Sequence, residues 1–161
     1  MKVFLSLGSN TGNRKKYLTH AIRDLNDLND TEVLESSSIY ETEPWGNKNL
    51  DLFLNQVIII NTELSCVDLL KRCNNIEKRY GRVKKSGKWM SRTLDIDILV
   101  CEDKKISTDQ LQVPHPWIAE RMFILKPLSE LDSNLIIPGI NKRVKEIIQA
   151  CDDTARVSLY K

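Results

Sequence analysis

Two aspartates one residue apart, Asp95 and Asp97, are the residues of this chain best suited to metal chemistry. They stand within an apolar run over residues 94–100, which predicts a strand. Alternate side chains of a strand share a face, so the two carboxylates are expected to point the same way, with α-carbons roughly 7 Å apart. Four apolar side chains are expected on the opposite face: Leu94, Ile96, Ile98 and Val100.

A divalent cation would relieve the repulsion between these two carboxylates. Mg²⁺ typically takes one or two carboxylates together with phosphate oxygens, so Asp95 and Asp97 favour a metal–nucleotide site. An ordinary exposed sheet face is the alternative. Aspartate is depleted in strands, however, and two of them among apolar residues favour the metal site.

A basic segment leads into this strand. Its five cations are Arg82, Lys84, Lys85, Lys88 and Arg92. Such a cluster can hold a triphosphate and neutralise charge on a transferred group, and its serine and glycine are typical of a mobile lid. A solvated basic loop without a ligand is the alternative. Trp89 in the same segment could stack on a flat ligand or anchor the loop to the body of the protein.

Two further segments contain residues that could bind phosphate. His115 stands between two prolines and could donate to a phosphate or make only a structural hydrogen bond. Residues 8–14, Gly-Ser-Asn-Thr-Gly-Asn-Arg, join a predicted strand to a predicted helix. No Lys-Ser/Thr pair follows the second glycine, so this segment is predicted to be a tight connector and a P-loop kinase is disfavoured.

The elements that position these residues follow from hydrophobic periodicity. Strands are predicted over residues 3–7, 33–40, 53–62, 94–100 and 156–159. Helices are predicted around residues 18–28, from Ser65 to a stop at Gly81, and over residues 127–131 and 144–150. The order strand, helix, strand, strand, helix, strand is that of a split βαβ unit. The sequence therefore predicts an α+β fold, a ferredoxin-like antiparallel sheet with helices packed over it, in a single domain over residues 1–161.

Composition limits the class of protein. The 24 basic and 22 acidic residues leave a net charge of +2, which argues against a whole surface built for nucleic acid. No apolar run approaches the ~20 residues of a membrane span, and the first residues lack the features of a secretory signal. The four cysteines form no CxxC pair or zinc spacing. A cytoplasmic, reduced protein with no nucleic-acid or membrane partner is expected, as a monomer.

Taken together and in order, these residues resemble the 6-hydroxymethyl-7,8-dihydropterin pyrophosphokinase family over most of the chain. The signature of that family is a basic loop that leads into Arg92-Thr93-Leu94-Asp95-Ile96-Asp97-Ile98. The other matching motifs are Leu7-Gly8-Ser9-Asn10, residues 40–46, Phe53-Leu54-Asn55, Ile76-Glu77 with Gly81-Arg82, Val113-Pro114-His115-Pro116, Arg121, Phe123 and Lys126-Pro127-Leu128.

The resemblance implies an activity in folate biosynthesis. Pyrophosphate would pass from ATP to the hydroxymethyl group of 6-hydroxymethyl-7,8-dihydropterin, with attack on the β-phosphorus and release of AMP. Asp95 and Asp97 would hold two Mg²⁺ ions, and Arg82 and Arg92 would be the catalytic contacts to phosphate. Positioning and charge neutralisation would then be the work of the protein, and no general base is assigned.

The resemblance also implies two sets of binding residues. Those expected to bind ATP are Glu77, Lys84, Trp89, Ile98, Leu111, Gln112, His115 and Arg121. Those expected to bind the pterin are Thr42, Pro44, Trp45, Phe53, Asn55 and Phe123, with the pterin ring between the two phenylalanines.

Three positions depart from the family pattern. Met90 stands where glycine or alanine is usual, Lys84 where arginine is common, and Phe53 where tyrosine often stands. These differences bear on loop closure and affinity more than on the reaction. Three other functions remain open: an RNA-binding module, although the aromatic RNP1 pattern is missing, a different metal-dependent nucleotidyl transferase, and a non-catalytic pterin or nucleotide binder.

Overall fold

One antiparallel sheet runs through the middle of the molecule. The structure, a computed structural model, describes residues 1–82 and 90–161. Within these residues the strands pair in the order β5-β1-β4-β3-β8, and β2 also pairs with β4. The bounds are β1 Lys2–Ser9, β2 Thr31–Ser36, β3 Tyr40–Thr42, β4 Phe53–Thr62, β5 Asp95–Cys101 and β8 Val157–Leu159. A separate small ribbon pairs β6 Ile106–Ser107 with β7 Gln112–Val113.

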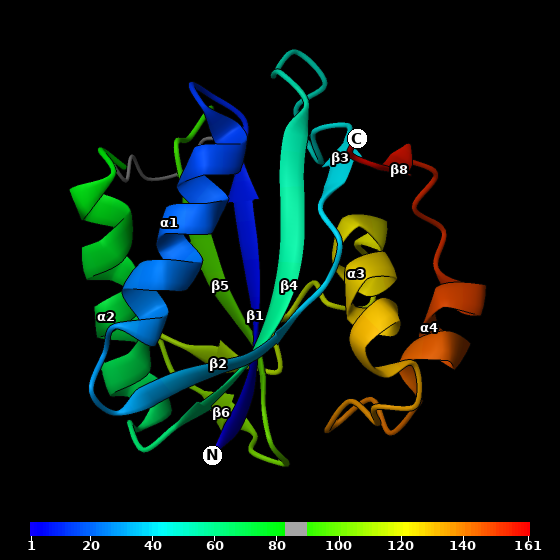
Figure 1. The fold of residues 1–161 in the computed structure, drawn as a ribbon. Helices are drawn as coiled ribbons and strands as arrows, with labels where there is room; N and C mark the ends of the chain where they lie inside the picture. Colours follow the sequence, from blue (N-terminus) through cyan, green and yellow to red (C-terminus); the bar gives the residue numbers. More distant parts are fainter. Residues whose placement is uncertain (83–89) are drawn as a thin grey trace.

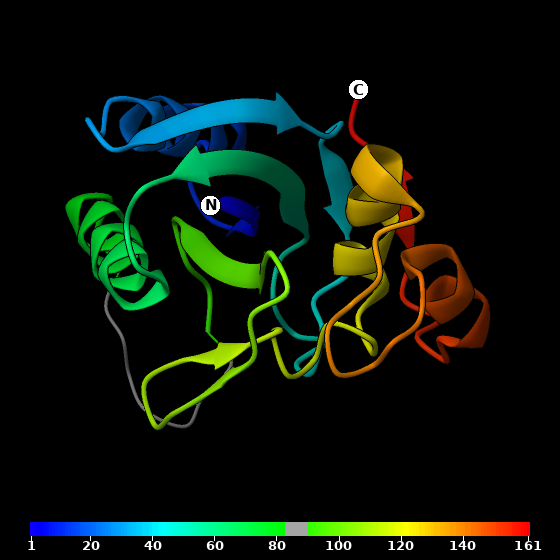
Figure 2. The same ribbon diagram turned by 90° about the horizontal axis from the view of Figure 1, so that it is seen from below.

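Helices cover both faces of this sheet (Figures 1 and 2). Their bounds are α1 Arg14–Asn26, α2 Cys66–Arg79, α3 Met122–Asp132 and α4 Val144–Ala150. Helices α1 and α2 lie on one face, and α3 and α4 lie on the other. The spatial order β5-β1-β4-β2 is that of a split βαβ unit, so the predicted ferredoxin-like α+β fold is confirmed.

Side chains of the central strands alternate between two hydrophobic cores. On β1, Val3, Leu5 and Leu7 pack toward α1 and α2, whereas Phe4 packs with α3 and α4. The alternation continues along β1, so Ser6 and Gly8 share the face of Phe4. That face is therefore apolar at one end, where α3 and α4 cover it, and polar at the other end.

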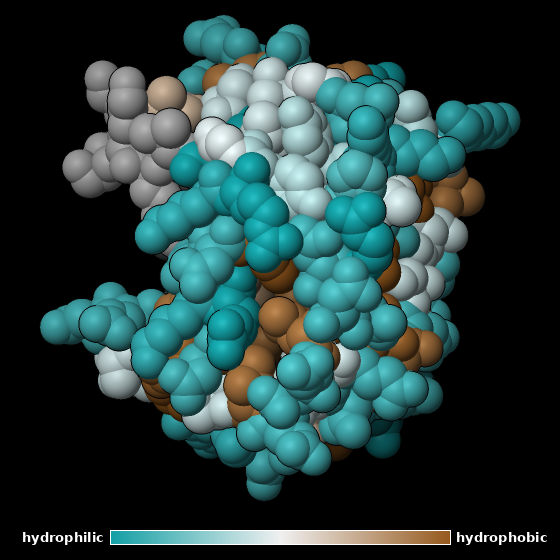
Figure 3. All heavy atoms as spheres, turned by 60° about the vertical axis from the view of Figure 1, so that its left-hand side comes forward, coloured by the Kyte–Doolittle hydropathy of each residue, from teal (hydrophilic) through white to brown (hydrophobic). Residues whose placement is uncertain are grey.

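The outer surface of α1 and α2 is mainly polar. Figure 3, which brings this side forward, shows hydrophilic side chains over most of it and apolar atoms in a small area near its middle. Two amphipathic helices with buried inner faces produce such a surface. Among the described residues, no helix has the length and apolar character that crossing a membrane requires.

Three predicted elements are wrong in detail. Val100 does not share a face with Ile98, because the pairing register shifts between Phe4 and Leu5, and the extra residue on β5 turns Val100 toward α3 and α4. The single strand predicted over residues 33–40 is two strands, β2 and β3, which residues 37–39 separate. The helix predicted over residues 127–131 begins earlier, at Met122, and includes Pro127 in its interior.

Candidate active site

The polar half of the sheet forms the floor of a cavity of about 260 Å³. Ser6 pairs with Asp97, and Gly8 pairs with both Asp95 and Asn55, so five adjacent positions of β5, β1 and β4 meet there. The residues that line the cavity are Ser6, Gly8, Thr42, Glu43, Trp45, Leu50, Phe53, Asn55, Arg82, Arg92, Asp95, Asp97, His115, Pro116, Trp117, Arg121 and Phe123.

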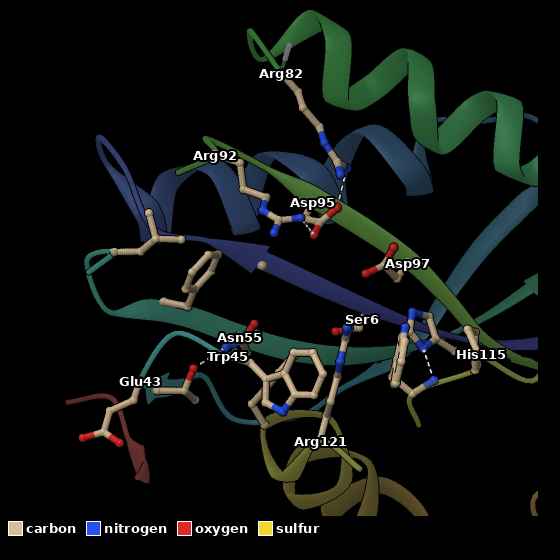
Figure 4. A pocket seen from close by; sticks show the side chains of 17 residues that line it. Ser6, Glu43, Trp45, Asn55, Arg82, Arg92, Asp95, Asp97, His115 and Arg121 are labelled. Carbon is tan, nitrogen blue, oxygen red and sulfur yellow. Dashed lines mark hydrogen bonds and ion pairs between the residues drawn. The ribbon is translucent and has the colours of Figure 1, made fainter. Parts of the chain in front are cut away.

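Arg82 reaches this floor from the end of α2. The N–H of Gly81 donates to the carbonyl of Lys78 (3.0 Å), and the N–H of Arg82 donates to the carbonyl of Glu77 (3.1 Å). This is a Schellman turn, which needs the positive φ of 82° that Gly81 supplies. It directs the Arg82 guanidinium to the carboxylate of Asp95 (Figure 4) and to that of Glu77.

Glu77 lies behind Arg82 and lines neither this cavity nor the hollow next to it. Its side chain is buried, with 1% of its surface exposed. The carboxylate accepts from the Arg82 guanidinium and, at 2.8 Å, from the backbone N–H of Ile96 on β5. Glu77 therefore fixes the end of α2 to β5, and its expected contact with ATP stays a prediction.

Arg92 contacts Asp95 from the opposite side of the carboxylate (Figure 4). Its backbone is fixed by Asn10: the Arg92 N–H donates to Asn10 Oδ1 (2.7 Å), and the Asn10 N–H donates to the Arg92 carbonyl (3.1 Å). Asn10 Nδ2 also donates to the carbonyl of Asp51 and to Ser91 Oγ, both at 3.3 Å. Asn10 thus connects the end of β1 to the segments on both sides of the cavity.

The carboxyl group of Asp97 has a raised pKa. Burial, together with the negative charge of Asp95, raises it to about 7, whereas Arg82 and Arg121 oppose the shift. A positive ion next to Asp97 would favour its charged form.

A magnesium ion fits this pair of carboxylates. Within residues 1–82 and 90–161, no group of three or more His, Cys, Asp or Glu side chains could hold a metal ion. A site made of Asp95 and Asp97 would therefore need its other ligands from a substrate or water. Mg²⁺ commonly binds in this way, through one or two carboxylates and the phosphates of a nucleotide.

His115 is held as a neutral hydrogen-bond donor. Its backbone N–H donates to the carbonyl of Leu99 (2.9 Å), and its Nδ1 accepts from the N–H of Trp117 (3.1 Å). Burial lowers the pKa of the imidazole to about 4, and the positive charge of Arg121 contributes. With Nδ1 accepting, the proton of the neutral ring is on Nε2, which can donate to a ligand.

Aromatic rings surround Arg121 on the other side of the cavity. Its guanidinium lies 4.5 Å from the ring centre of Trp45, 5.7 Å from Phe123 and 5.8 Å from Trp117 (Figure 4). Burial lowers the pKa of Arg121, and Asp97 opposes this shift. The guanidinium remains charged, because its ordinary pKa lies far above neutrality.

The residues predicted to bind the pterin line the cavity, with one exception. Asn55 and Thr42 are buried, and Asn55 Nδ2 donates to Thr42 Oγ1 at 2.6 Å. Phe53 and Phe123 both line the cavity, on β4 and α3. Pro44 is buried and does not line it.

A second hollow, of about 470 Å³, adjoins the cavity. The two share Asp97, His115 and Pro116. The hollow also contains the predicted ATP residues Ile98, Leu111 and Gln112. Its remaining lining residues are Leu70, Ser107, Thr108, Asp109 and Gln110, on α2 and around the β6–β7 ribbon. Lys84 and Trp89, also predicted for ATP, lie outside the described residues.

Sequence reasoning missed several residues that line the cavity: Ser6, Gly8, Glu43, Leu50, Pro116 and Trp117. A signal was present for Ser6 and Gly8, because they alternate with the apolar Val3, Leu5 and Leu7 and so mark a polar face of β1. No local pattern indicates Leu50 or Trp117, which the fold brings in from loops.

A family model and several known proteins similar to this chain are described as pterin pyrophosphokinases. A family model, "7,8-dihydro-6-hydroxymethylpterin-pyrophosphokinase (HPPK)", matches residues 4–133. The 2-amino-4-hydroxy-6-hydroxymethyldihydropteridine pyrophosphokinase of Aquifex aeolicus (strain VF5) is 41% identical over 144 residues, 89% of this chain and 88% of the relative. The protein of the same name from Bacillus subtilis (strain 168) is 41% identical over 128 residues, 80% of this chain and 76% of the relative.

A solved structure shares the fold. The crystal structure of Plasmodium falciparum HPPK-DHPS wild type with pteroate matches with a TM-score of 0.75 at 14% identity. The match covers 92% of this chain and 42% of that one, so this chain spans less than half the length of the solved protein. At this identity the match concerns the arrangement of helices and strands alone.

Proposed function

The chain belongs to the 7,8-dihydro-6-hydroxymethylpterin-pyrophosphokinase family, and we propose that the cavity over β5, β1 and β4, with the hollow next to it, is its active site. The reaction transfers pyrophosphate from ATP to the hydroxymethyl group of 6-hydroxymethyl-7,8-dihydropterin in folate biosynthesis, and gives AMP and the pterin pyrophosphate. One observation carries the assignment. Arg82 and Arg92 both contact Asp95, and Asp97 next to it lines both the cavity and the hollow.

The pterin occupies the cavity in this proposal. A flat heterocycle fits between the rings of Phe53 and Phe123, and its polar edge meets Asn55, Thr42 and the segment that ends at Trp45. Asn55 Nδ2 is already bonded to Thr42, so Asn55 Oδ1 is the atom left to accept from an N–H of the pterin.

ATP occupies the neighbouring hollow, with its phosphates directed to the junction. Ile98, Leu111 and Gln112 surround the base, and the Nε2–H of His115 donates to the nucleotide. Guanidinium N–H groups of Arg82 and Arg92, which contact Asp95, are also suitable donors to phosphate oxygens. Arg121, which lines the cavity, adds positive charge where the β-phosphate meets the pterin hydroxyl.

We propose magnesium dependence with two ions, which Asp95 and Asp97 hold together with phosphate oxygens. Bound there, the metal supplies positive charge against the triphosphate and lowers the cost of placing it beside two carboxylates. The residues of the chain then orient the hydroxyl oxygen toward the β-phosphorus and neutralise charge, and no side chain is assigned as a general base. The chain is further proposed to act as a cytoplasmic monomer with a single domain and without nucleic-acid or membrane partners.

The test is a product assay with purified protein, Mg²⁺, ATP and the pterin alcohol. AMP is expected to appear one-for-one with the pterin pyrophosphate. Pyrophosphate as the product instead of AMP would indicate a nucleotidyl transferase, and binding of both ligands without turnover would indicate a binding protein.

The metal assignment is tested by Asp97→Asn and Asp95→Asn. Each removes one carboxylate charge at nearly constant shape. Turnover is expected to fall by roughly a thousandfold or more, because the lost carboxylate also weakens binding of the metal charge at the reacting phosphates. Asp103→Asn is the matched control, since Asp103 is exposed on the turn after β5 and lines neither space. Full activity of either site variant at ordinary magnesium would disprove the metal assignment.

A further inference from the structure

Asp24 and Tyr80 form a buried polar link outside both binding spaces. Asp24 on α1 has 7% of its surface exposed, and its Oδ2 accepts from the hydroxyl of Tyr80 (2.7 Å) and from Arg79 Nη1 (3.1 Å). Tyr80 is the C-cap of α2, and its ring lies edge-on to that of Tyr17 at 5.9 Å. The link thus fixes the C-terminal end of α2 to α1.

Tyr80 contacts the backbone segments that carry both of the arginines proposed to bind phosphate. Arg82 follows it by two residues, through the turn at Gly81. On the other side, the hydroxyl of Thr93 donates to the Tyr80 carbonyl at 2.6 Å, and Thr93 directly follows Arg92. The backbone of Tyr80 therefore connects the position of Arg82 to that of Arg92.

The two arginines meet at one carboxylate, so their relative position matters. Arg82 contacts Asp95 Oδ1 and Arg92 contacts Asp95 Oδ2. A shift of Tyr80 would move the backbone before Arg82. Through the bond to Thr93, it would move the backbone of Arg92 as well. Displacements near 1 Å at such distances can lower a rate by about a hundredfold.

We propose that the Tyr80–Asp24 link is a positioning device for the pyrophosphoryl transfer. It holds Arg82 and Arg92 in register with each other on Asp95 without touching a substrate. The inference rests on the proposed function, in which both arginines contact phosphate. Neither Asp24 nor Tyr80 lines the cavity or the hollow, so their effect on the reaction is indirect.

A matched control for this link exists elsewhere in the fold. The hydroxyl of Tyr40 on β3 donates to Glu130 Oε2 on α3 at 2.8 Å. This bond also joins a tyrosine of one element to a carboxylate of another, but neither residue lines a binding space or contacts the arginines. Tyr40→Phe and Tyr80→Phe therefore remove similar bonds with different consequences for the reaction.

The experiment compares kcat, KM for each substrate and melting temperature for wild type, Tyr80→Phe and Tyr40→Phe. Tyr80→Phe is expected to lower kcat roughly tenfold and to weaken binding of a non-hydrolysable ATP analogue with Mg²⁺, while the KM for the pterin stays the same. Tyr40→Phe is expected to lower the melting temperature with kcat unchanged. If kcat of Tyr80→Phe equals that of wild type, the inference is wrong.

The pair Thr93→Val and Thr93→Ser keeps the test decisive if Tyr80→Phe does not fold. Thr93→Val removes the hydroxyl that bonds to Tyr80 and should lower kcat, whereas Thr93→Ser keeps the hydroxyl and should restore it. Where Tyr80→Phe does fold, the double variant Asp24→Asn/Tyr80→Phe should be no slower than its slower single variant, because both changes break the same Tyr80–Asp24 bond. Additive losses would mean that the two residues act independently, which contradicts the proposal.

Failure of this inference can be told apart from failure of the proposed function. If wild-type protein forms no AMP from ATP and the pterin, the function is wrong and the role of the link falls with it. If wild type is active and Tyr80→Phe is equally active, only the positioning role is wrong.

Discussion

At the scale of single residues, Gly8 determines how much room the cavity floor offers. A Cβ added there would lie 3.1 Å from Asn55 Oδ1 and within 3.9 Å of Phe53. Asn55 cannot move away freely, because its Nδ2 is bonded to Thr42. A side chain at this position would therefore crowd Asn55 beneath the proposed pterin.

Gly8→Ala is expected to raise the KM for the pterin roughly tenfold, because overpacking of a tight site typically costs 1–3 kcal/mol. The KM for ATP should change little, since the hollow does not include Gly8. Steady-state kinetics with each substrate varied in turn gives both values. An unchanged pterin KM would mean that the pterin does not lie over Gly8.

His115 gives the protein a pH-dependent stability. Its folded-state pKa is lowered to about 4 from an ordinary 6.5, so the unfolded chain takes up a proton first as the pH falls. The stability is therefore complete above pH 6.5 and declines as the pH falls toward 4. Between pH 7 and pH 5 the expected loss is about 2 kcal/mol.

Denaturant unfolding of wild type and His115→Gln at several pH values measures this loss. The variant lacks the titrating ring, so its stability should fall less steeply between pH 7 and pH 5. Parallel curves would show that the imidazole titrates near its ordinary pKa in the folded protein.

The sequence indicates most residues of the site but not their protonation states. The types and spacing of Asp95, Asp97, Arg82 and Arg92 are enough to expect a charged cluster. The neutral form of His115 depends on its burial and on Arg121, and Arg121 is brought to it by the fold. Burial by distant segments has no local pattern.

At the scale of elements, the turn that ends α2 determines where Arg82 lies. Gly81 has a φ of 82°, and a Cβ there would meet no atom of residues 1–82 and 90–161 within 4 Å. The effect expected of a substitution is therefore backbone strain.

Gly81→Ala is expected to lower the free energy of unfolding by about 1 kcal/mol, and Gly81→Asn by less, because asparagine tolerates the left-handed region better. kcat should follow the same order, since the strain moves Arg82. Thermal melts and kcat values for both variants provide the check. Equal losses for alanine and asparagine would contradict the explanation by φ.

Elements are predictable where a repeating pattern is long. The apolar run of residues 53–62 gives the bounds of β4, and Ser65 and Gly81 frame α2 correctly. The turn of Val100 to the other face was not predictable, because the register shift on β5 depends on its pairing with β1. A single extra residue leaves no trace in composition.

At the scale of the whole molecule, the C-terminal segment supports the cavity from outside the region that the family model matches. Strand β8 pairs with β3, with Val157 opposite Thr42. The N–H of Glu43 donates to the Arg156 carbonyl (3.2 Å), and the N–H of Arg156 donates to Glu43 Oε2 (3.1 Å). Thr42 and Glu43 both line the cavity.

Deletion of residues 154–161 is expected to raise the KM for the pterin roughly fivefold, since the loss of about 1 kcal/mol of hydrogen bonding loosens β3. The KM for ATP should stay near that of wild type. Deletion of Lys161 alone is the control, because it leaves β8 intact. An equal rise in both KM values would show a general loss of structure in place of a local one.

The overall plan follows from the order of elements, whereas its long-range contacts do not. The split βαβ order predicts how β1, β2, β4 and β5 are arranged. The position of β8 does not follow from it, because Thr42 and Val157 are far apart in sequence and both strands are only three residues long. Such pairings depend on the whole packed structure.

Strand β8 also determines how the sheet ends. It covers the edge of β3, which would otherwise present unpaired N–H and C=O groups to other molecules. Its residues are half-buried or exposed, so few apolar contacts retain it when the protein is warmed. Loss of this short strand would bare a sheet edge while the two cores are still intact, and chains could then join edge to edge. We therefore expect aggregation on heating to begin when these three residues detach, below the temperature at which the cores unfold.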